Sequence, residues 1–407
     1  MTSCRRIILF LVVLAAVSCS PHDDDIVGRW RAWLDSPGGE LPFGLEIIRT
    51  EDRLEALIIN GFERILVEDV VFDGGELVIS FPHYDSEIRA RLDYSLFGEW
   101  SKRTGAGWSK LPFNAELDAP TVRFSPSVTL HGDPDAITGR WAVDFSEDDN
   151  PAVAIFESPS PGTVHGTFLT TTGDYRYLAG DWDGERLRLS CFDGAHAFLF
   201  DATLGASGDL TGDFWSRDTW HETWTARLDP EAELPDGFEL TRWTGEVSLD
   251  DLAFPDIDGN LRSLSDPDLH GKVTILEIFG TWCPNCNDAS KTMVGLHRRY
   301  RGRGLAIVGL AFEVTGDHER DAAQVRLYAE RHRVDYPLLL AGLSDKSQAS
   351  TAFPAIDRVR AYPTFVFLDA TGEVRAVYSG FSGPATGEAH RRLVKSFETL
   401  IDRLFSE

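Results

Sequence analysis

The strongest constraint on the fold of this chain is a pair of cysteines three positions apart, Cys283 and Cys286, between a strand-like and a helix-like stretch. Residues 272–279 before the pair form a nearly continuous apolar run, as in strands buried on both faces of a parallel sheet. The residues after the pair carry apolar side chains at helical spacing up to Tyr300, and a second apolar run covers 305–312. The pattern predicts a βαβ unit with the cysteines at the C-terminal edge of its first strand, where open α/β sheets place their active sites.

Two cysteines one helical turn apart can pass between a dithiol and a disulfide without backbone movement. The unpaired N–H groups and the dipole at a helix N-terminus favour a thiolate at Cys283. A zinc site would need a second pair of Cys or His ligands at suitable spacing, and the sequence offers none, so we predict no metal. A static disulfide within one helical turn would be strained and reducible, which favours a redox-active pair over a structural one.

Glu277 places a carboxylate inside the apolar strand, six residues before Cys283. Burial without a partner disfavours the charged form and raises the pKa of a carboxyl group, so Glu277 could hold a proton near neutral pH. The alternative is a carboxylate that reaches solvent at the edge of the sheet.

The N-terminus has the pattern of an export signal. Arg5 and Arg6 precede an apolar run over 7–17, which is too short to span a bilayer core of about 30 Å. Residues 1–18 are therefore predicted to be a signal peptide. Ala16-Val17-Ser18-Cys19 resembles a bacterial lipobox, so we expect Cys19 to carry lipid and to anchor the chain to a membrane. The alternative is ordinary signal-peptidase cleavage, with Cys19 incidental.

Composition limits the class of protein. With 407 residues, of which 43% are hydrophobic and 26% charged, the chain can form two or three domains with real cores. A net charge of −26 argues against nucleic acid as a partner and leaves the lipid on Cys19 as the expected membrane contact. Cys191 shares a strand face with Leu187 and Leu189, which predicts a small buried hydrophobe rather than a regulatory thiol.

Residues 26–230 carry a duplicated pattern. Gly28-Arg29-Trp30 returns as Gly139-Arg140-Trp141, and Leu77-Val78-Ile79-Ser80-Phe81 returns as Leu187-Arg188-Leu189-Ser190-Cys191. Both copies consist of short alternating stretches separated by glycine turns. We predict an antiparallel meander in each copy, which closes into its own barrel or into one larger barrel with its twin.

The predicted fold class is therefore multidomain, with an all-β duplicated N-terminal region followed by an α/β domain. The expected boundaries are residues 26–120 and 135–229 for the two β repeats, 230–245 for a linker, and 246–407 for the α/β domain. The aromatic residues of the β region would suit a ligand or partner at a barrel mouth. Alternatively, they fill the barrel ends as core, for which the candidates are Trp30, Trp100, Trp141 and Trp215.

Several ordered motifs in the last part of the chain resemble one known family. They are Ala253-Phe254-Pro255-Asp256, Phe279-Gly280-Thr281-Trp282-Cys283 and Ala361-Tyr362-Pro363-Thr364, followed by a Thr371-Gly372 turn and a final amphipathic helix. Residues 246–405, about two fifths of the chain, resemble the thioredoxin superfamily, and within it the exported TlpA/ResA-like thiol-disulfide oxidoreductases. The resemblance does not extend to residues 26–230.

The resemblance implies roles for five residues besides Cys283. Cys286 would resolve the mixed disulfide, and Glu277 would accept its proton directly or through a water. A cis peptide bond at Pro363 would leave the backbone of Tyr362 free to pair with an extended substrate. Trp282 would shield one side of the cysteine pair, or simply pack there. No cofactor is implied.

The expected reaction is reduction of disulfides in periplasmic proteins, by attack of the Cys283 thiolate. The resemblance implies a membrane electron donor that reduces the dithiol again, on the periplasmic side of the bacterial cell envelope, at the inner or the outer membrane. Two alternatives remain open: a peroxiredoxin-like thiol peroxidase, whose entry segment is similar, and a redox-sensing binding protein whose β region captures a ligand or client.

Overall fold

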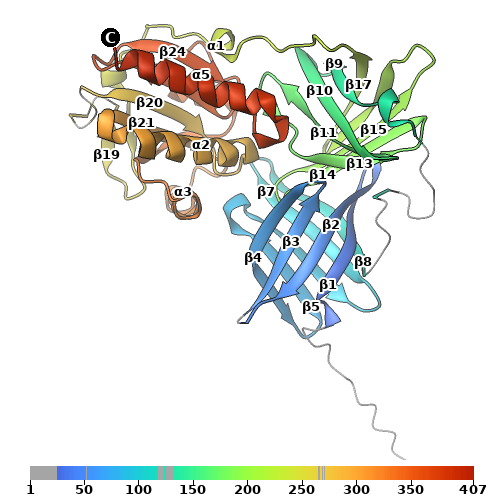
Figure 1. Ribbon diagram of the computed structural model, residues 1–407. Coiled ribbons are helices and arrows are strands. Elements are labelled where there is room, and N and C mark those ends of the chain that lie inside the picture. The colour runs from blue at the N-terminus through green and yellow to red at the C-terminus, as the bar shows by residue number, and fades with distance from the viewer. Residues whose placement is uncertain are drawn as a thin grey trace, which may run out of the picture.

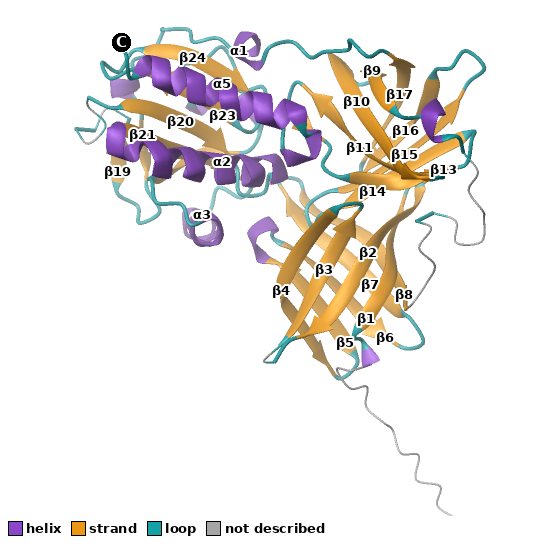
Figure 2. Ribbon diagram, viewed as in Figure 1, coloured by secondary structure: helices purple, strands orange, loops and turns teal. Residues whose placement is uncertain are grey.

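The computed structural model describes residues 25–51, 53–117, 123–124, 132–264, 266–267, 269 and 271–407. These residues form two β-barrels and one α/β domain, in which nearly all the helices gather (Figures 1 and 2). The predicted fold class is confirmed. The predicted signal peptide and Cys19 lie outside the described residues. Within the described part of the chain, no helix combines the length and apolarity needed to cross a bilayer.

The first barrel is an antiparallel meander that closes on itself. Its last strand pairs with its first, for example through Trp30 and Leu117. Apolar side chains alternate inward along each strand and fill the barrel. Its strands are β1 Gly28–Ser36, β2 Gly39–Arg49, β3 Leu54–Asn60, β4 Glu63–Asp73, β5 Glu76–Phe81, β6 Ser86–Leu92, β7 Leu96–Thr104 and β8 Gly107–Leu117, with the short helix η2 Pro82–Tyr84 between β5 and β6.

The second barrel is a separate meander that also closes on itself. Of the two predicted forms of closure, the structure therefore shows one barrel for each copy and not one larger barrel. Pairing of β10 with β11 completes the ring, and β12 is attached to β11. Its strands are β9 Gly139–Phe145, β10 Asp148–Ser160, β11 Thr163–Thr170, β12 Gly173–Asp174, β13 Leu178–Trp182, β14 Arg186–Phe192, β15 Ala197–Leu204, β16 Leu210–Ser216 and β17 Trp220–Leu228, preceded by η3 Pro134–Ala136.

Most of the tryptophans named from the sequence belong to the barrel cores. Trp30 and Trp141 are buried at equivalent places, and each indole Nε1 donates to the carbonyl four residues earlier, at 2.9 and 3.1 Å. Trp100 is also buried. Trp215 is different: it is half-buried and lies against the β1–β2 turn of the first barrel, where a Cβ on Gly38 would come within 2.3 Å of its ring. Cys191 is fully buried in the second core, as the strand alternation predicts.

The α/β domain is built on a five-stranded sheet in the order β22-β21-β20-β23-β24. Strands β20 and β21 are parallel, and β23 runs antiparallel to β20. The strands are β20 Val273–Phe279, β21 Leu305–Glu313, β22 Leu338–Leu343, β23 Thr364–Leu368 and β24 Val374–Ser379, with a hairpin of β18 Ala253–Pro255 and β19 Leu261–Ser263. Every residue of β20 is buried, in agreement with its continuous apolar sequence.

Helices cover both faces of this sheet. Helices α2 and α5 lie side by side in front of it in Figure 1, and Arg299 of α2 forms an ion pair with Glu398 of α5. Helix α2 begins with a proline at its first position and ends at Tyr300, as predicted. The helices are α1 Gly237–Leu240, α2 Pro284–Tyr300, α3 His318–His332, α4 Lys346–Ala352 and α5 Glu388–Leu404, with short turns η4 Leu249–Asp251, η5 Arg301–Arg303 and η6 Pro384–Thr386.

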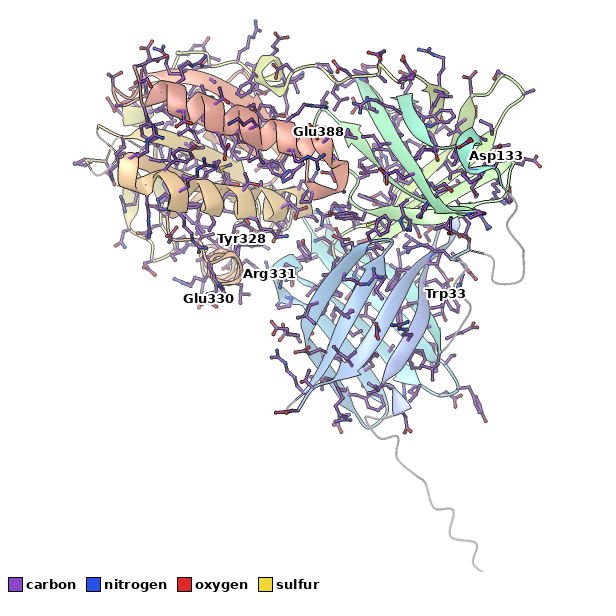
Figure 3. All side chains as sticks on the ribbon, viewed as in Figure 1. Trp33, Asp133, Tyr328, Glu330, Arg331 and Glu388 are labelled. Atoms are coloured by element: carbon purple, nitrogen blue, oxygen red, sulfur yellow. The ribbon has the colours of Figure 1, made fainter. Side chains whose placement is uncertain are left out.

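Both barrels pack against the α/β domain. Helix α3 contacts η2 of the first barrel, and Figure 3 shows Arg331 at the end of α3 beside that barrel. Arg320, near the start of α3, forms an ion pair with Asp85, directly after η2. The second barrel reaches the first turn of α2. The dithiol therefore lies where three bodies meet: the first barrel, the second barrel and the α/β domain.

Candidate active site

Cys283 and Cys286 lie at the N-terminus of α2, immediately after the sheet. Cys283 is the N-cap residue, and its Sγ accepts the backbone N–H of Cys286 at 3.3 Å. On its other side, the Cys283 thiol lies 3.5 Å from the carbonyl oxygen of Tyr362 and can donate to it. Both cysteines are free thiols; Cys283 is 7% exposed and Cys286 is fully buried. Only Cys283 therefore offers a surface to a reactant.

The surroundings shift the two thiols in opposite directions. Burial opposes ionisation of Cys283, but the Cys286 thiol, the N–H groups of Cys286 and Asn285, and the charge of Arg176 outweigh it, so the pKa of Cys283 lies below the ordinary value of 9.0. Burial and the adjacent Cys283 raise the pKa of Cys286 well above that value. The pair thus has one thiolate-forming member and one protonated member.

Glu277 lies in the middle of β20 beneath the dithiol and is 1% exposed. Tyr336 donates its hydroxyl to Glu277 Oε2 at 3.3 Å, while Oε1 is buried and has no hydrogen-bond partner in the described structure. Burial raises the pKa of Glu277 to about 8, against the smaller opposing effect of Tyr336. The charge of Glu277 in turn raises the pKa of Cys286, which places the two groups within electrostatic reach.

Trp282, Tyr362 and Pro363 lie around Cys283; Trp282 is partly exposed, and the other two are buried. The Tyr362–Pro363 peptide bond is cis. The ring of Trp282 meets that of Tyr362 edge to face, with centroids 5.4 Å apart, and its Nε1 donates to the carbonyl of Phe312 at 2.9 Å. A Cβ on Gly280 would come within 2.2 Å of that Nε1, so glycine at this position leaves room for the indole. The structure brings all six predicted catalytic and substrate-binding residues together.

A buried network holds the active-site loop, and Asn287 and Tyr328 in it were not predicted as site residues. Glu313, at the end of β21, accepts the backbone N–H and the hydroxyl of Thr281 at 2.9 and 2.7 Å, and burial raises its pKa to about 7. Asn287 donates to the carbonyl of Cys283 at 2.9 Å. Tyr328, from α3, donates to the carbonyl of Cys286 at 3.0 Å. These contacts fix the backbone on both sides of the dithiol.

Three charged residues after the second apolar strand have different partners: Glu313, Arg320 and Arg326. Glu313 contacts the active-site loop. Arg320 instead pairs with Asp85 of the first barrel, and Arg326 pairs with Asp258 of the entry segment at 3.1 Å. The spacing of residues along a helix does not indicate the ion-pair partners of its arginines, because these depend on which segments pack against α3.

The loop around β12 of the second barrel rests directly on the dithiol helix. Asn285, between the two cysteines, donates its Nδ2 to the carbonyl of Asp174 at 3.3 Å. The Asp174 carboxylate accepts the N–H of Gly383 at 2.6 Å, in the loop before α5. A Cβ on Gly173 would come within 1.9 Å of Asn285 Nδ2, so only glycine permits this approach. Neither repeats nor alternation in the sequence indicated this contact.

Arg176, two residues further along, joins all three bodies. Its buried guanidinium pairs with Asp288 of α2, with Glu63 of the first barrel at 3.1 Å and with Asp193 of the second at 3.3 Å. Because the surrounding carboxylates are themselves buried, removing the guanidinium would leave uncompensated charges. The barrels are therefore electrostatically fixed to the helix that carries the dithiol.

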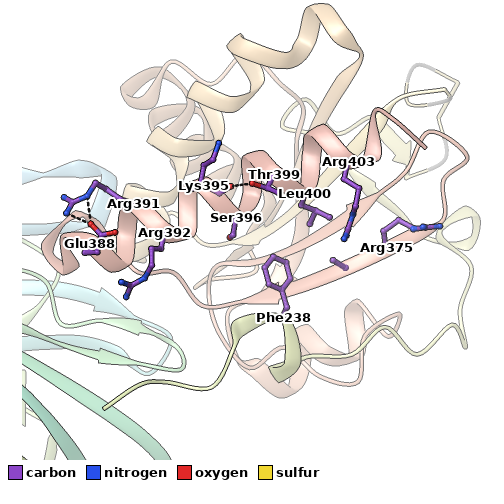
Figure 4. Close-up of a pocket in the computed structure, with 11 residues that line it drawn as sticks. Phe238, Arg375, Glu388, Arg391, Arg392, Lys395, Ser396, Thr399, Leu400 and Arg403 are labelled. Carbon is purple, nitrogen blue, oxygen red and sulfur yellow. Dashed lines mark hydrogen bonds and ion pairs between the residues drawn. The ribbon is translucent and has the colours of Figure 1, made fainter. Parts of the chain in front are cut away.

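A second concave surface lies on α5, away from the dithiol (Figure 4). This groove, of about 880 Å³, is lined by residues of α1, β24 and α5 and is rich in arginine. Several of these arginines are ion-paired at the surface: Arg391 with Glu388 at 2.5 Å, and Arg375 with Glu407 at 2.8 Å. The dithiol carries two thiols with shifted pKa values, whereas several of the groove's charged side chains are in ion pairs at the surface. We therefore take the dithiol as the functional site.

Comparisons with known proteins match the part of the chain that contains the α/β domain. Residues 245–377 match the model of the AhpC/TSA family. The chain is 28% identical over 130 residues to Thioredoxin-like protein YneN of Bacillus subtilis, covering 32% of this chain and 68% of the relative. It is 28% identical over 145 residues to Thiol-disulfide oxidoreductase ResA of Geobacillus kaustophilus, covering 36% and 75%.

A solved thiol:disulfide interchange protein from Chlorobium tepidum is 26% identical and covers 35% of this chain and 92% of its own, with a TM-score of 0.27. The family match and the sequence relatives confirm the resemblance stated from the motifs: the α/β domain is thioredoxin-like.

Proposed function

We propose that this chain is a thiol-disulfide oxidoreductase that reduces disulfide bonds of exported proteins through Cys283 and Cys286, within residues 246–407. The observation that carries the proposal is the opposite shift of the two thiols at the N-terminus of α2: the more accessible cysteine is the one whose pKa is lowered. The names of the sequence relatives support the same reaction class.

The reaction begins with attack of the Cys283 thiolate on a substrate disulfide, which forms a mixed disulfide and releases one substrate thiolate. Cys286 then loses its proton to Glu277, directly or through a water, and attacks Cys283 Sγ. The second substrate thiolate leaves, and Cys283 and Cys286 are joined as a disulfide. Two electrons have passed from the enzyme to the substrate, and the backbone of Tyr362 can pair with the substrate chain during both steps.

The cellular setting belongs to the same proposal. The signal peptide and lipid on Cys19 would hold the protein in the bacterial cell envelope, with the dithiol on the periplasmic side. A membrane electron donor would return two electrons to the Cys283–Cys286 disulfide, because the periplasm offers no thiol buffer for that purpose.

A thiol peroxidase is the second candidate, since the AhpC/TSA family model covers 245–377. We expect the full-length protein with Cys19→Ala, which removes the lipid site, to reduce insulin disulfides at least tenfold faster than dithiothreitol alone and to consume hydrogen peroxide no faster than the Cys283→Ala variant. Rapid peroxide consumption without disulfide reduction would reverse this choice. A strongly oxidising potential of the pair would reverse the direction of electron flow.

A further inference from the structure

The second barrel has a cavity of about 350 Å³ between its β9–β10 and β16–β17 turns, where Tyr175 also lines it. Five aromatic residues line it, together with six polar or charged ones: Phe145, Tyr175, Phe198, Phe214 and Trp220, and Glu147, Asp148, Ser216, Arg217, Thr219 and Glu222. The rings of Tyr175 and Phe214 are stacked with centroids 5.2 Å apart, and Trp220 is 46% exposed. The volume is near the lower end of the roughly 300–1,000 Å³ of ligand pockets, which suits one or two side chains better than a large molecule.

One short loop connects this cavity to the dithiol. Asp174 and Arg176 contact Asn285 and Asp288 of the dithiol helix. Tyr175, between them, contributes its ring to the cavity wall. The residues that touch the dithiol helix and the residue that lines the cavity are therefore neighbours in sequence.

Charges on the rim of the cavity place the same two sites close together. Burial lowers the pKa of Lys346, at the start of α4, and the charges of Asp148 on the rim and of Cys283 both oppose this shift. Burial and the charge of Arg217 on the rim lower the pKa of Lys102, in β7, to about 8, and the charge of Cys283 opposes this shift. Cys283 and the rim of the cavity therefore both lie within electrostatic reach of Lys346 and of Lys102.

The second barrel contacts the first turn of α2, where Asn285 donates to the carbonyl of Asp174. A polypeptide that pairs with the backbone of Tyr362 beside Cys283 would therefore lie near the second barrel. Aromatic rings in the cavity wall favour binding of an aromatic side chain, because stacked and edge-to-face ring pairs stabilise the bound state beyond the effect of burial alone.

We propose that this cavity is a specificity pocket, which takes an aromatic side chain of the substrate polypeptide near its disulfide. The inference rests on the proposed function and deepens it, since it names the class of substrate: disulfide-bonded polypeptides with an aromatic residue a few positions from one cysteine. The barrels then have a direct part in substrate choice.

The test uses pairs of disulfide-linked peptides that differ only in phenylalanine or alanine at successive positions around the cysteine, together with bis(2-hydroxyethyl) disulfide as a small substrate. For the wild-type protein we expect kcat/KM to be about tenfold higher for phenylalanine than for alanine at one or two positions. Ser216→Trp, which fills the cavity, and Trp220→Ala, which removes part of its wall, should reduce this ratio to below threefold. Neither should change the rate with the small disulfide.

Trp108→Ala is the matched control, because Trp108 is an equally exposed tryptophan (49%) on the first barrel, where it packs against Arg103. It should leave the ratio unchanged. A wild-type ratio near one at every position, or a ratio that survives both cavity variants, would overturn the pocket while leaving the oxidoreductase intact. Failure of the wild-type protein with the small disulfide and with all peptides would instead overturn the proposed function.

Discussion

Cys286→Ala is expected to abolish turnover and to leave Cys283 joined to the substrate as a mixed disulfide. The first attack needs only the Cys283 thiolate, which remains, whereas release of the substrate needs a second thiol at position 286. Incubation with insulin followed by non-reducing electrophoresis and mass analysis should show a covalent adduct that dithiothreitol dissolves. Turnover should fall by at least 10³-fold, because no other described cysteine lies beside Cys283.

The chain contains a matched control for this variant. Cys191, like Cys286, is fully buried, but it lies in the core of the second barrel. Cys191→Ala therefore removes the same volume from a core and should change turnover by less than twofold, with no adduct. Cys283→Ala should form no adduct at all. An adduct through Cys286 in that variant, or normal turnover of Cys286→Ala, would refute the assigned order of attack.

Glu277→Gln is expected to slow resolution of the mixed disulfide about 10²-fold near pH 7, because Gln cannot accept the proton of Cys286. In the wild-type protein, the resolution rate should rise with pH as the carboxyl group ionises, with a midpoint near the raised pKa of about 8. In the Gln variant this rise should disappear, and only the thiol's own ionisation at higher pH should remain. Single-turnover mixing of the reduced protein with a disulfide peptide separates this step from the first attack.

Stability gives an independent readout of the same carboxyl group. Its folded pKa of about 8 lies above the ordinary 4.5, so between these values the folded protein keeps a proton that the unfolded chain has released. The free energy of unfolding should therefore fall as pH rises from about 5 to 8, and this fall should be absent in Glu277→Gln. Tyr336→Phe, which removes the hydrogen bond to Glu277 but keeps the acid, should change resolution much less. Equal resolution rates in wild-type and Gln proteins would exclude Glu277 as the base.

The sequence predicted the parts of the site that depend on local pattern. The apolar run of β20, the proline that starts α2 and the spacing of its apolar residues place Cys283 and Cys286 at a strand-to-helix junction, as the structure has them. The alternation around Cys191 likewise predicted its burial. In each case neighbours in sequence determine which face a side chain presents.

The contacts between bodies could not be predicted in this way. Arg176 is one arginine in a β region that gives no chemical motif, and its partners Glu63, Asp193 and Asp288 are spread over three bodies. Trp215 was expected in a barrel end and instead lies half-buried between the barrels. Packing between domains depends on surface shape and on pairs of charges that are distant in sequence. The periodicity of apolar residues along the chain therefore does not predict it.

The most direct test of this account is the pH dependence of alkylation of the freshly reduced protein, with each cysteine followed by peptide mass analysis. Cys283 is expected to react first, with a midpoint below the ordinary cysteine value of 9.0, while Cys286 and Cys191 stay unmodified in the folded protein. An unreactive Cys283, or one that titrates at or above the ordinary value, would contradict the central claim that this fold produces a nucleophilic thiolate there.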